Sequence, residues 1–313
     1  MGKRILIALG GNALQEAGKP ATAQAQLAVV RQTADYIADI IAMGYAVILT
    51  HGNGPQVGRI VQQNEYANAI TPAMPFDVCG AMSQGMIGYH IQQCLMDAMQ
   101  ARGLNKQAVT LLTQVVVDQQ DPRFQNPSKP IGRFYTQAEA EAIQRENPDQ
   151  TFKEDAGRGW RRVVPSPLPV EIVELDAIKC LVDQGFVTIA AGGGIPVIRE
   201  NGQLQGTAAV IDKDFASEKL AEAVDADQLL ILTGVDQVCV NYNKPDQKGL
   251  DRLSVAQARQ YMAEGQFAPG SMLPKVEAAV RFAASKPGRE TLITSLEKAV
   301  DALQGKTGTV VYA

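Results

Sequence analysis

Short apolar runs alternate with amphipathic stretches along most of the chain. Five runs have the length and the hydrophobic character of buried strands: residues 4–9, 45–50, 109–117, 186–191 and 228–233. Most neighbouring runs are separated by a stretch with helical spacing, which is typical of β-α-β units. The pattern therefore predicts an α/β fold, with an open, mostly parallel sheet sandwiched between helices as an α/β/α arrangement.

The amphipathic stretches carry apolar residues at helical spacing. The first is predicted to end at Gly44, and its buried face consists of residues three or four positions apart: Leu27, Val30, Ala34, Ile37 and Ile41. Further helices are predicted at about 55–68, 78–102, 176–184, from 214, 254–265, 274–285 and 297–303, with two last strands at 291–295 and 309–312.

Two local signals add detail to this pattern. Ser254 with Gln257 three residues later is typical of a capping box, which places a helix start there. Asn201-Gly202 lies between two short extended segments and predicts a tight β-hairpin turn.

Residues 119–165 interrupt the alternation. The segment is rich in Pro, Arg, Asn and Asp and has few branched apolar residues, so it is either a loose surface insertion or a small subdomain attached to the sheet. Its local motifs, described below, favour the subdomain. We predict an N-terminal lobe over residues 1–215 that carries this protruding subdomain, and a C-terminal lobe over residues 216–313.

Composition narrows the class of protein. A chain of 313 residues, 46% hydrophobic and 20% charged, can bury a large core without disulfides. The apolar run near the N-terminus is too short for a signal peptide, and no run approaches the ~20 residues that span a membrane. The net charge of -4 argues against a nucleic-acid partner.

The cysteines indicate the compartment in which the protein works. They form no CxxC pair, so we expect buried thiols in a reducing, cytoplasmic compartment and neither a zinc site nor a disulfide framework. They are Cys79, Cys94, Cys180 and Cys239.

Three glycine-rich turns follow directly after predicted strands. They are Gly10-Gly11-Asn12, Gly52-Asn53-Gly54 and Gly192-Gly193-Gly194. Glycine lets the backbone approach a ligand closely and lets successive N–H groups converge on an anion. Any one of them could be an ordinary tight turn. Because all three lie at the strand ends where α/β sheets bind ligands, they predict a phosphate or carboxylate site.

Two lysines occupy positions that a helix start disfavours for a cation. Lys213 precedes the helix expected from Asp214, and Lys275 follows Pro274, a residue favoured at the first helical position. A cation there opposes the helix dipole by about 0.3–1 kcal/mol. Long side chains can turn into solvent, but two such lysines beside three anion-binding turns predict a polyphosphate between them. Asp214 could cap its helix, bind Mg²⁺ or orient the lysines.

Other common site signatures are missing. Gly305-Lys306-Thr307 resembles the end of a P-loop, but Val300 occupies the position that requires glycine. No GxGxxG follows the first predicted strand, which disfavours a dinucleotide oxidoreductase. His51 and His90 have no serine or cysteine arrangement that suggests a triad, and His51 is expected to be a packed, hydrogen-bonded histidine.

These motifs together resemble the carbamate kinases, a branch of the amino-acid-kinase family, over nearly the whole chain. Residues 7–14 and 50–58 resemble the first two signatures of that family, and residues 192–197, 210–214 and 270–275 resemble later ones. The more specific likeness is that of residues 127–132 and 154–167 to the family's protruding subdomain, which other members of the wider family lack.

Three positions refine or depart from this resemblance. Ala8 occupies the place where several amino-acid-kinase relatives have a catalytic lysine, and the resemblance implies that Lys129, from the subdomain, replaces that charge. Trp160 stands where tyrosine is usual, and Leu168 where lysine is expected.

The resemblance implies that ATP and carbamate are converted reversibly to ADP and carbamoyl phosphate. Lys213 and Lys275 are expected to bind the nucleotide phosphates and the transferring group, with Asp214 orienting them and Lys129 closing over the reaction. The backbone of residues in the three turns is expected to hold carbamate and the moving phosphoryl group: Gly10, Gly11, Asn12, Gly52, Asn53, Gly54, Gly193 and Gly194.

The resemblance also implies where the nucleotide binds and what accompanies it. The adenine side is expected in the C-terminal lobe near Thr233, Tyr242 and Met272. Mg²⁺ is expected to bind through ATP and water, with no protein ligand assigned. A homodimer is implied, as is a role in making ATP during breakdown of arginine or of purine-derived ureides.

Two rival functions follow from the same residues. A kinase of this fold for another small carboxylate or a nucleotide should keep the first-strand lysine and lack the subdomain motifs, so Ala8 and Lys129 disfavour it. A non-catalytic nucleotide-sensing module should have lost Lys213, Asp214 or Lys275, and all three are present.

Overall fold

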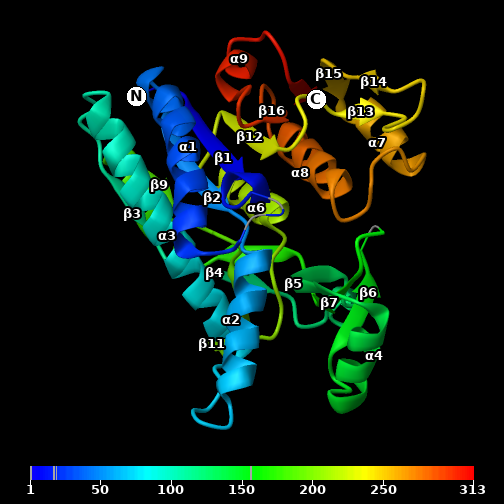
Figure 1. Cartoon of the computed structure of the whole chain (residues 1–313). Helices are drawn as coiled ribbons and strands as arrows, with labels where there is room; N and C mark the ends of the chain where they lie inside the picture. The colour runs from blue at the N-terminus through cyan, green and yellow to red at the C-terminus, as the bar shows by residue number, and fades with distance from the viewer. Residues whose placement is uncertain (1, 17, 19, 156) are drawn as a thin grey trace.

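The computed structural model describes residues 2–16, 18, 20–155 and 157–313, so Ala156 of the predicted subdomain motif lies outside the described residues. An eight-stranded sheet runs through the body of the molecule (Figure 1). Its strands are β1 (Arg4–Leu9), β2 (Ala46–His51), β3 (Ala108–Thr110), β9 (Val187–Ile189), β12 (Gln228–Thr233), β15 (Arg252–Ser254), β16 (Glu290–Ser295) and β17 (Thr309–Tyr312).

The order across this sheet is β15-β17-β16-β12-β1-β2-β9-β3, and all neighbours pair in parallel except β16 and β17. Side chains of successive strand residues point to opposite faces. In β1, Ile5 and Ile7 enter one apolar core and Leu6 and Ala8 enter another. The strand is therefore buried on both sides, as its continuous apolar run predicts, and the predicted α/β class is confirmed.

Helices cover both faces of the sheet. One face packs against α1 (Ala23–Ala42), α3 (Phe76–Ala101) and α9 (Ala299–Leu303). The other packs against α5 (Leu175–Asp183), α6 (Lys213–Ala223), α7 (Val255–Ala263) and α8 (Met272–Ser285). Across the described residues, none of the helices combines the length and the apolar character needed to traverse a bilayer.

A second sheet corrects one prediction. Residues 109–117 do not form one strand: β3 belongs to the main sheet, whereas β4 (Gln114–Val117) joins a four-stranded sheet with β8 (Pro169–Ile172), β10 (Ile195–Glu200) and β11 (Gln203–Gly206). The chain leaves the main sheet after Leu111 and reaches the second sheet at Thr113, whose N–H donates to Gln84 Oε1 at 2.7 Å. A side chain from α3 thus takes the place of a strand partner at the break.

Local signals elsewhere are confirmed. Asn201 and Gly202 have φ of 50° and 80° between β10 and β11, the backbone that a tight hairpin turn requires. Ser254 and Gln257 form the predicted capping box at the start of α7. The expectation for the cysteines is right for Cys79 and Cys94, which are buried, and wrong for Cys180, which is exposed, and Cys239, which is partly exposed.

The segment that interrupts the alternation folds into a small unit of its own. Antiparallel strands β5 (Lys129–Tyr135), β7 (Trp160–Val164) and β6 (Thr151–Glu154) form a sheet in that order, and α4 (Gln137–Glu146) packs against it. In Figure 1 this unit projects from the body beside α2 (Gly54–Ala67), below α8. The two short strands β13 (Cys239–Val240) and β14 (Lys248–Gly249) pair near α7.

Candidate active site

The carboxyl ends of the central parallel strands meet at one edge of the main sheet. The three glycine turns follow β1, β2 and β9 at this edge. The second and third turns press against each other, because a Cβ on Gly193 would lie 2.4 Å from the side chain of Asn53. A Cβ on Gly192 would lie 2.1 Å from His51 Nε2. Only glycine allows the two turns this approach.

A cavity of about 790 Å³ opens beside the first turn and extends into the C-terminal half. Residues from β12, the β13 region and the start of α8 form its wall. It brings together the first turn and every residue predicted to bind nucleotide: Gly10, Gly11, Asn12, Lys213, Thr233, Tyr242, Met272 and Lys275.

The other predicted substrate residues lie on the far side of Lys213. None of Gly52, Asn53, Gly54, Gly193 and Gly194 is among the residues that line the cavity. A Cβ on Gly52 would lie 3.8 Å from Lys213 Cγ, so the second turn borders the stem of that lysine. Lys213 thus lies where two regions adjoin: the cavity, which holds the predicted nucleotide residues and the first turn, and the region of the second and third turns.

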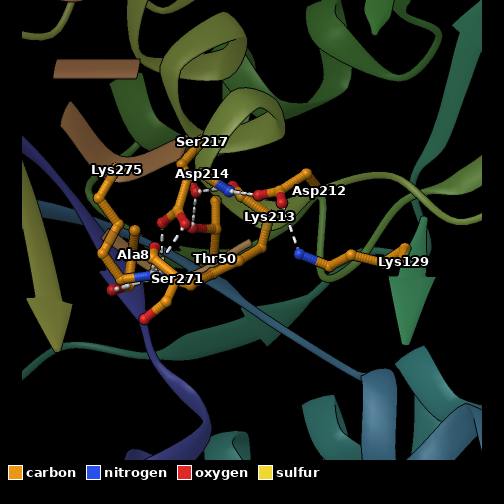
Figure 2. Close-up of polar contacts among 9 residues, drawn as sticks. All are labelled: Ala8, Thr50, Lys129, Asp212, Lys213, Asp214, Ser217, Ser271 and Lys275. Atoms are coloured by element: carbon orange, nitrogen blue, oxygen red, sulfur yellow. Dashed lines mark hydrogen bonds and ion pairs between the residues drawn. The ribbon is translucent and has the colours of Figure 1, made fainter. Parts of the chain in front are cut away.

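Asp214 joins the two predicted lysines into one ion cluster (Figure 2). Its Oδ1 lies 2.8 Å from Lys213 Nζ and its Oδ2 lies 3.1 Å from Lys275 Nζ. All three side chains are largely buried, at 4% exposure for Asp214, 11% for Lys213 and 14% for Lys275. Lys213 Nζ also donates to the carbonyl of Ala8 at 3.4 Å. The ammonium group therefore lies beside the end of β1.

A second pair adjoins this cluster from the subdomain. Lys129, the first residue of β5, places Nζ 2.5 Å from Asp212 Oδ2. The other oxygen of Asp212 accepts the backbone N–H of Asp214 at 2.9 Å, so one carboxylate links the subdomain to the first turn of α6. Figure 2 shows Lys129 approaching Asp212 from the opposite side to Lys275.

Asp212 is the site residue that the sequence reasoning missed. It is the N-cap of α6, which makes Lys213 the first helical residue and leaves Asp214 inside the first turn. The reading of Asp214 as a cap was therefore wrong. A signal was available, because Asp directly before a helix is a preferred N-cap.

The start of α8 also differs from the prediction. The helix begins at Met272 after Ser271, so Pro274 is its third residue and not its first. Lys275 lies one position further, and its Nζ donates back to the Ser271 carbonyl at 3.3 Å. The side chain folds over the helix start and still reaches Asp214.

The first turn of α6 is fixed to the sheet by two hydroxyl groups. Ser217 Oγ lies 2.5 Å from Thr50 Oγ1 of β2, and it donates to the carbonyl of Lys213 at 2.6 Å. Both hydroxyl-bearing residues are fully buried. These two bonds therefore fix the position of the Lys213 backbone relative to the end of β2.

Burial and neighbouring charges set the protonation of the cluster. Burial alone raises the pKa of Asp214, but Lys213 and Lys275 outweigh it and bring this pKa well below its usual range. Burial lowers the pKa of Lys213, and Lys275 adds to the effect against the attraction of Asp214. Burial also lowers the pKa of Lys129, but Asp212 reverses the shift and the net pKa is raised.

His51 is a packed residue, as expected. Its side chain is 1% exposed, and Nδ1 donates to the carbonyl of Gly52 at 2.9 Å. Burial lowers the pKa of His51 to about 4, so the ring is neutral near pH 7 and shapes the second glycine turn.

Comparison with known proteins assigns the family. The Amino acid kinase family matches residues 3–295. A carbamate kinase of Clostridium perfringens is 54% identical over 312 residues, covering 98% of this chain and 99% of that protein. A carbamate kinase-like protein of Escherichia coli is 53% identical, with 99% of each chain covered.

A solved structure agrees with these sequences. The carbamate kinase from Giardia lamblia bound to AMP-PNP superposes with a TM-score of 0.91 at 47% identity, covering 99% of this chain and 98% of that one. The chain therefore belongs to the amino acid kinase family and, within it, to the carbamate kinases.

Proposed function

We propose that the protein catalyses reversible phosphoryl transfer between ATP and carbamate, and that it runs towards ATP from carbamoyl phosphate and ADP. The observation that carries the proposal is the position of Lys213 between two regions. On one side lies the cavity with Thr233, Tyr242 and Met272. On the other side lie the turns after β2 and β9.

The nucleotide is assigned to the cavity, whose size suits a mononucleotide. The Giardia lamblia relative, solved with AMP-PNP, supports this assignment. Carbamoyl phosphate is assigned to the region of Gly52–Gly54 and Gly193–Gly194. The phosphoryl group then passes between the two regions beside Lys213, with the first turn, Gly10–Asn12, at the boundary.

In the ATP-forming direction, an oxygen of the ADP β-phosphate attacks phosphorus while the bond from phosphorus to the carbamoyl oxygen breaks. Carbamate leaves as an anion, so the step requires no general base. The work is positioning and stabilisation of charge on the transferring oxygens. Lys213 and Lys275 are assigned to that charge, Asp214 to holding their ammonium groups, and Lys129 to the carbamoyl phosphate side.

Mg²⁺ enters this proposal with the nucleotide. Among residues 2–16, 18, 20–155 and 157–313, no three His, Cys, Asp or Glu side chains gather as a metal-binding group. Asp214 is already engaged by two ammonium groups. These residues do not fit a protein-held ion, so no protein ligand is assigned and Mg²⁺ is treated as part of the nucleotide substrate.

A homodimer is proposed through the outer face of α3. Four exposed apolar side chains recur there at helical spacing, so they form one stripe along the helix. They are Val78, Met82, Tyr89 and Met96, with exposed fractions of 36%, 47%, 61% and 37%. A stripe of this kind, left open on one chain, is the type of surface that a second copy covers.

The cellular setting stays a prediction from the sequence. A reducing cytoplasm suits four cysteines without a disulfide among the described residues. Breakdown of arginine or of purine-derived ureides is the proposed source of carbamoyl phosphate.

The test is ATP formation from ADP, Mg²⁺ and carbamoyl phosphate, measured with the wild type and with Lys213→Ala. We expect rapid turnover by the wild type and loss of most of it in the variant. A wild type without turnover would contradict the proposed reaction and favour another carboxylate or nucleotide acceptor. Full activity in the variant would keep the reaction and overturn the role of Lys213.

A further inference from the structure

Helix α2 and strand β5 approach each other more closely than any side chain would allow. A Cβ on Gly58 would lie 2.0 Å from the backbone nitrogen of Gly132 and 2.2 Å from its Cα. One turn earlier, a Cβ on Gly54 would lie 3.6 Å from the carbonyl oxygen of Pro130. Gly54 and Gly58 therefore present one face of α2 on which the backbone of β5 rests.

The same strand is fixed from its other side. Arg161 of β7 donates from Nη2 to the carbonyl of Gly132 at 3.0 Å, and its Nη1 lies 3.3 Å from Asp155. Gly132 has φ of 70°, and the pairing of β5 with β7 shifts register just after Ile131. Gly132 is thus held between α2 and a largely buried guanidinium.

This joint lies three residues from Lys129. The Ile131 side chain is 1% exposed and packs with Val57 of α2 and with Val210, two residues before Asp212. The segment after β7 is tied to the same place, because the N–H of Val210 donates to the Pro165 carbonyl at 3.0 Å. The contacts of β5 with α2 and with the segment before Asp212 therefore fix where the Lys129 end of β5 lies relative to Asp212.

Beyond the joint, α2 and the subdomain separate. A cavity of about 400 Å³ lies there, lined by residues of both, among them Glu65, Arg133 and Arg162. The ion pair between Arg162 and Glu65, at 2.7 Å, crosses between them near the surface. Ion pairs at the surface contribute little free energy, so the distance between α2 and β5 is set by the tight backbone contact at Gly58.

We infer that Gly58 is a positioning residue: its contact with Gly132 sets the reach of Lys129 to Asp212 and to the transferring phosphoryl group. A methyl group at position 58 would push β5 away by about 1 Å, and a misplacement of that size can lower a rate roughly 100-fold. The inference rests on the proposed role of Lys129, so its test includes a measurement that does not depend on turnover.

The first arm of the test is kinetic. In Gly58→Ala we expect kcat for ATP formation to fall roughly 10- to 100-fold, with the KM for ADP within about twofold, because α2 does not border the nucleotide cavity. In the Lys129→Ala background the same change should have little further effect. Effects of the two substitutions that simply multiply would overturn the inference.

The matched control is Gly80→Ala. Gly80 is the fifth residue of α3, as Gly58 is of α2, and a Cβ there meets nothing within 4 Å. It reproduces the change in helix propensity without the clash. We expect Gly80→Ala to keep the wild-type kcat.

The second arm measures the lysine directly. Lys129 is acetylated with a dilute amine-reactive ester, and the extent is followed by peptide mass spectrometry over time on the folded proteins. We expect Lys129 in Gly58→Ala to react several-fold faster than in the wild type and in Gly80→Ala, because its pairing with Asp212 is lost. Equal rates in all three would overturn the inference even if the enzyme proved to have another substrate.

Arg161→Lys gives an independent variant should Gly58→Ala not fold. It keeps the charge but shortens the reach to the Gly132 carbonyl, so we expect faster acetylation of Lys129 here too. An unchanged rate in this variant would count against the joint as a positioning device.

Discussion

The carboxylate of Asp214 lies within 3.1 Å of the ammonium groups of Lys213 and Lys275 in a buried site. Its negative charge therefore helps to keep both lysines protonated. In Asp214→Asn the pKa of Lys213, already lowered by burial, loses its largest opposing influence and falls further. The lysine then gives up its proton at a lower pH. We expect kcat to drop roughly 100-fold and the alkaline limb of its pH profile to move to lower pH.

The measurement is kcat against pH from 6 to 10 for both proteins. Asp35→Asn serves as control, because Asp35 pairs with Arg102 at an exposed position. If the alkaline limb of the profile is unchanged in Asp214→Asn, the fall of kcat at high pH does not come from loss of the Lys213 proton.

Glu218 on α6 should make the free energy of unfolding depend on pH, and this dependence is independent of the pH profile of kcat. Burial, and after it the neighbouring Glu222, outweigh the opposing charges of Arg281 and Lys219 and raise the pKa of Glu218 to about 8. Above its ordinary pKa of 4.5 the unfolded chain releases this proton while the folded protein keeps it. The free energy of unfolding therefore falls as pH rises from about 4.5 to about 8.

Glu218→Gln stays neutral and should lack this fall. Between pH 6 and 8 we expect the wild type to lose roughly 2 kcal/mol relative to the variant, measured by urea unfolding at each pH. Glu141→Gln, at an exposed position of α4, should track the wild type. Parallel pH curves for wild type and Glu218→Gln would contradict the raised pKa.

The residues of the site differ in how far sequence alone could identify them. Lys213 and Lys275 break a rule of helix starts, and that local conflict marked them. Lys129 breaks no local rule, and only the family resemblance singled it out. Its position beside Asp212 depends on β5 resting on α2, a contact between segments that are distant in the sequence.

Among the elements, α3 and β4 are joined by one buried amide. Gln84 accepts the N–H of Thr113 at 2.7 Å and donates to the carbonyl of Gly192 at 3.1 Å. Gln84→Met keeps the volume but leaves both backbone groups without this partner. We expect the free energy of unfolding to fall by roughly 2–4 kcal/mol, measured by urea unfolding.

The control for this prediction lies on α4, away from the apolar stripe of α3. Gln144 is exposed, so Gln144→Met should change stability by less than about 0.5 kcal/mol. Equal stability of Gln84→Met and Gln144→Met would mean that the strand break needs no support from α3.

Element positions followed the hydrophobic pattern where burial is uniform. The predicted strands at residues 4–9 and 228–233 coincide with β1 and β12, because both lie in the centre of the sheet with helices on each face. The prediction of one strand over residues 109–117 is wrong because no Gly or Pro marks the break at Leu111–Thr113. The break is made by a side chain from another element, which leaves no local signal.

At the scale of the whole molecule, the site draws on the full length of the chain. The first strand, the subdomain and the start of α8 each supply part of it, and Asp212-Lys213-Asp214 joins them. No single segment could bind both substrates, which explains why the site is recognisable only as a set of spaced motifs. The proposed division into lobes at residue 215 would fall directly after this junction.

The outer face of α3 carries the last prediction, that of the oligomeric state. Met82, Tyr89 and Met96 are spaced by seven residues, so they lie on one line along the helix. A charge in the middle of a covered apolar stripe loses its solvation without gaining a partner. We expect the wild type to be a dimer and Tyr89→Asp to be a monomer at micromolar concentration, by light scattering after size exclusion.

Val170→Asp is the matched control, because Val170 is 50% exposed on β8, an edge strand away from α3. It should remain dimeric, which would separate loss of one surface from a general effect of added charge. Because Gln84 and Ser83 face inward from the same helix, the monomer should keep its fold and a measurable kcat. A wild type that elutes as a monomer would leave the stripe without its proposed occupant and overturn the dimer.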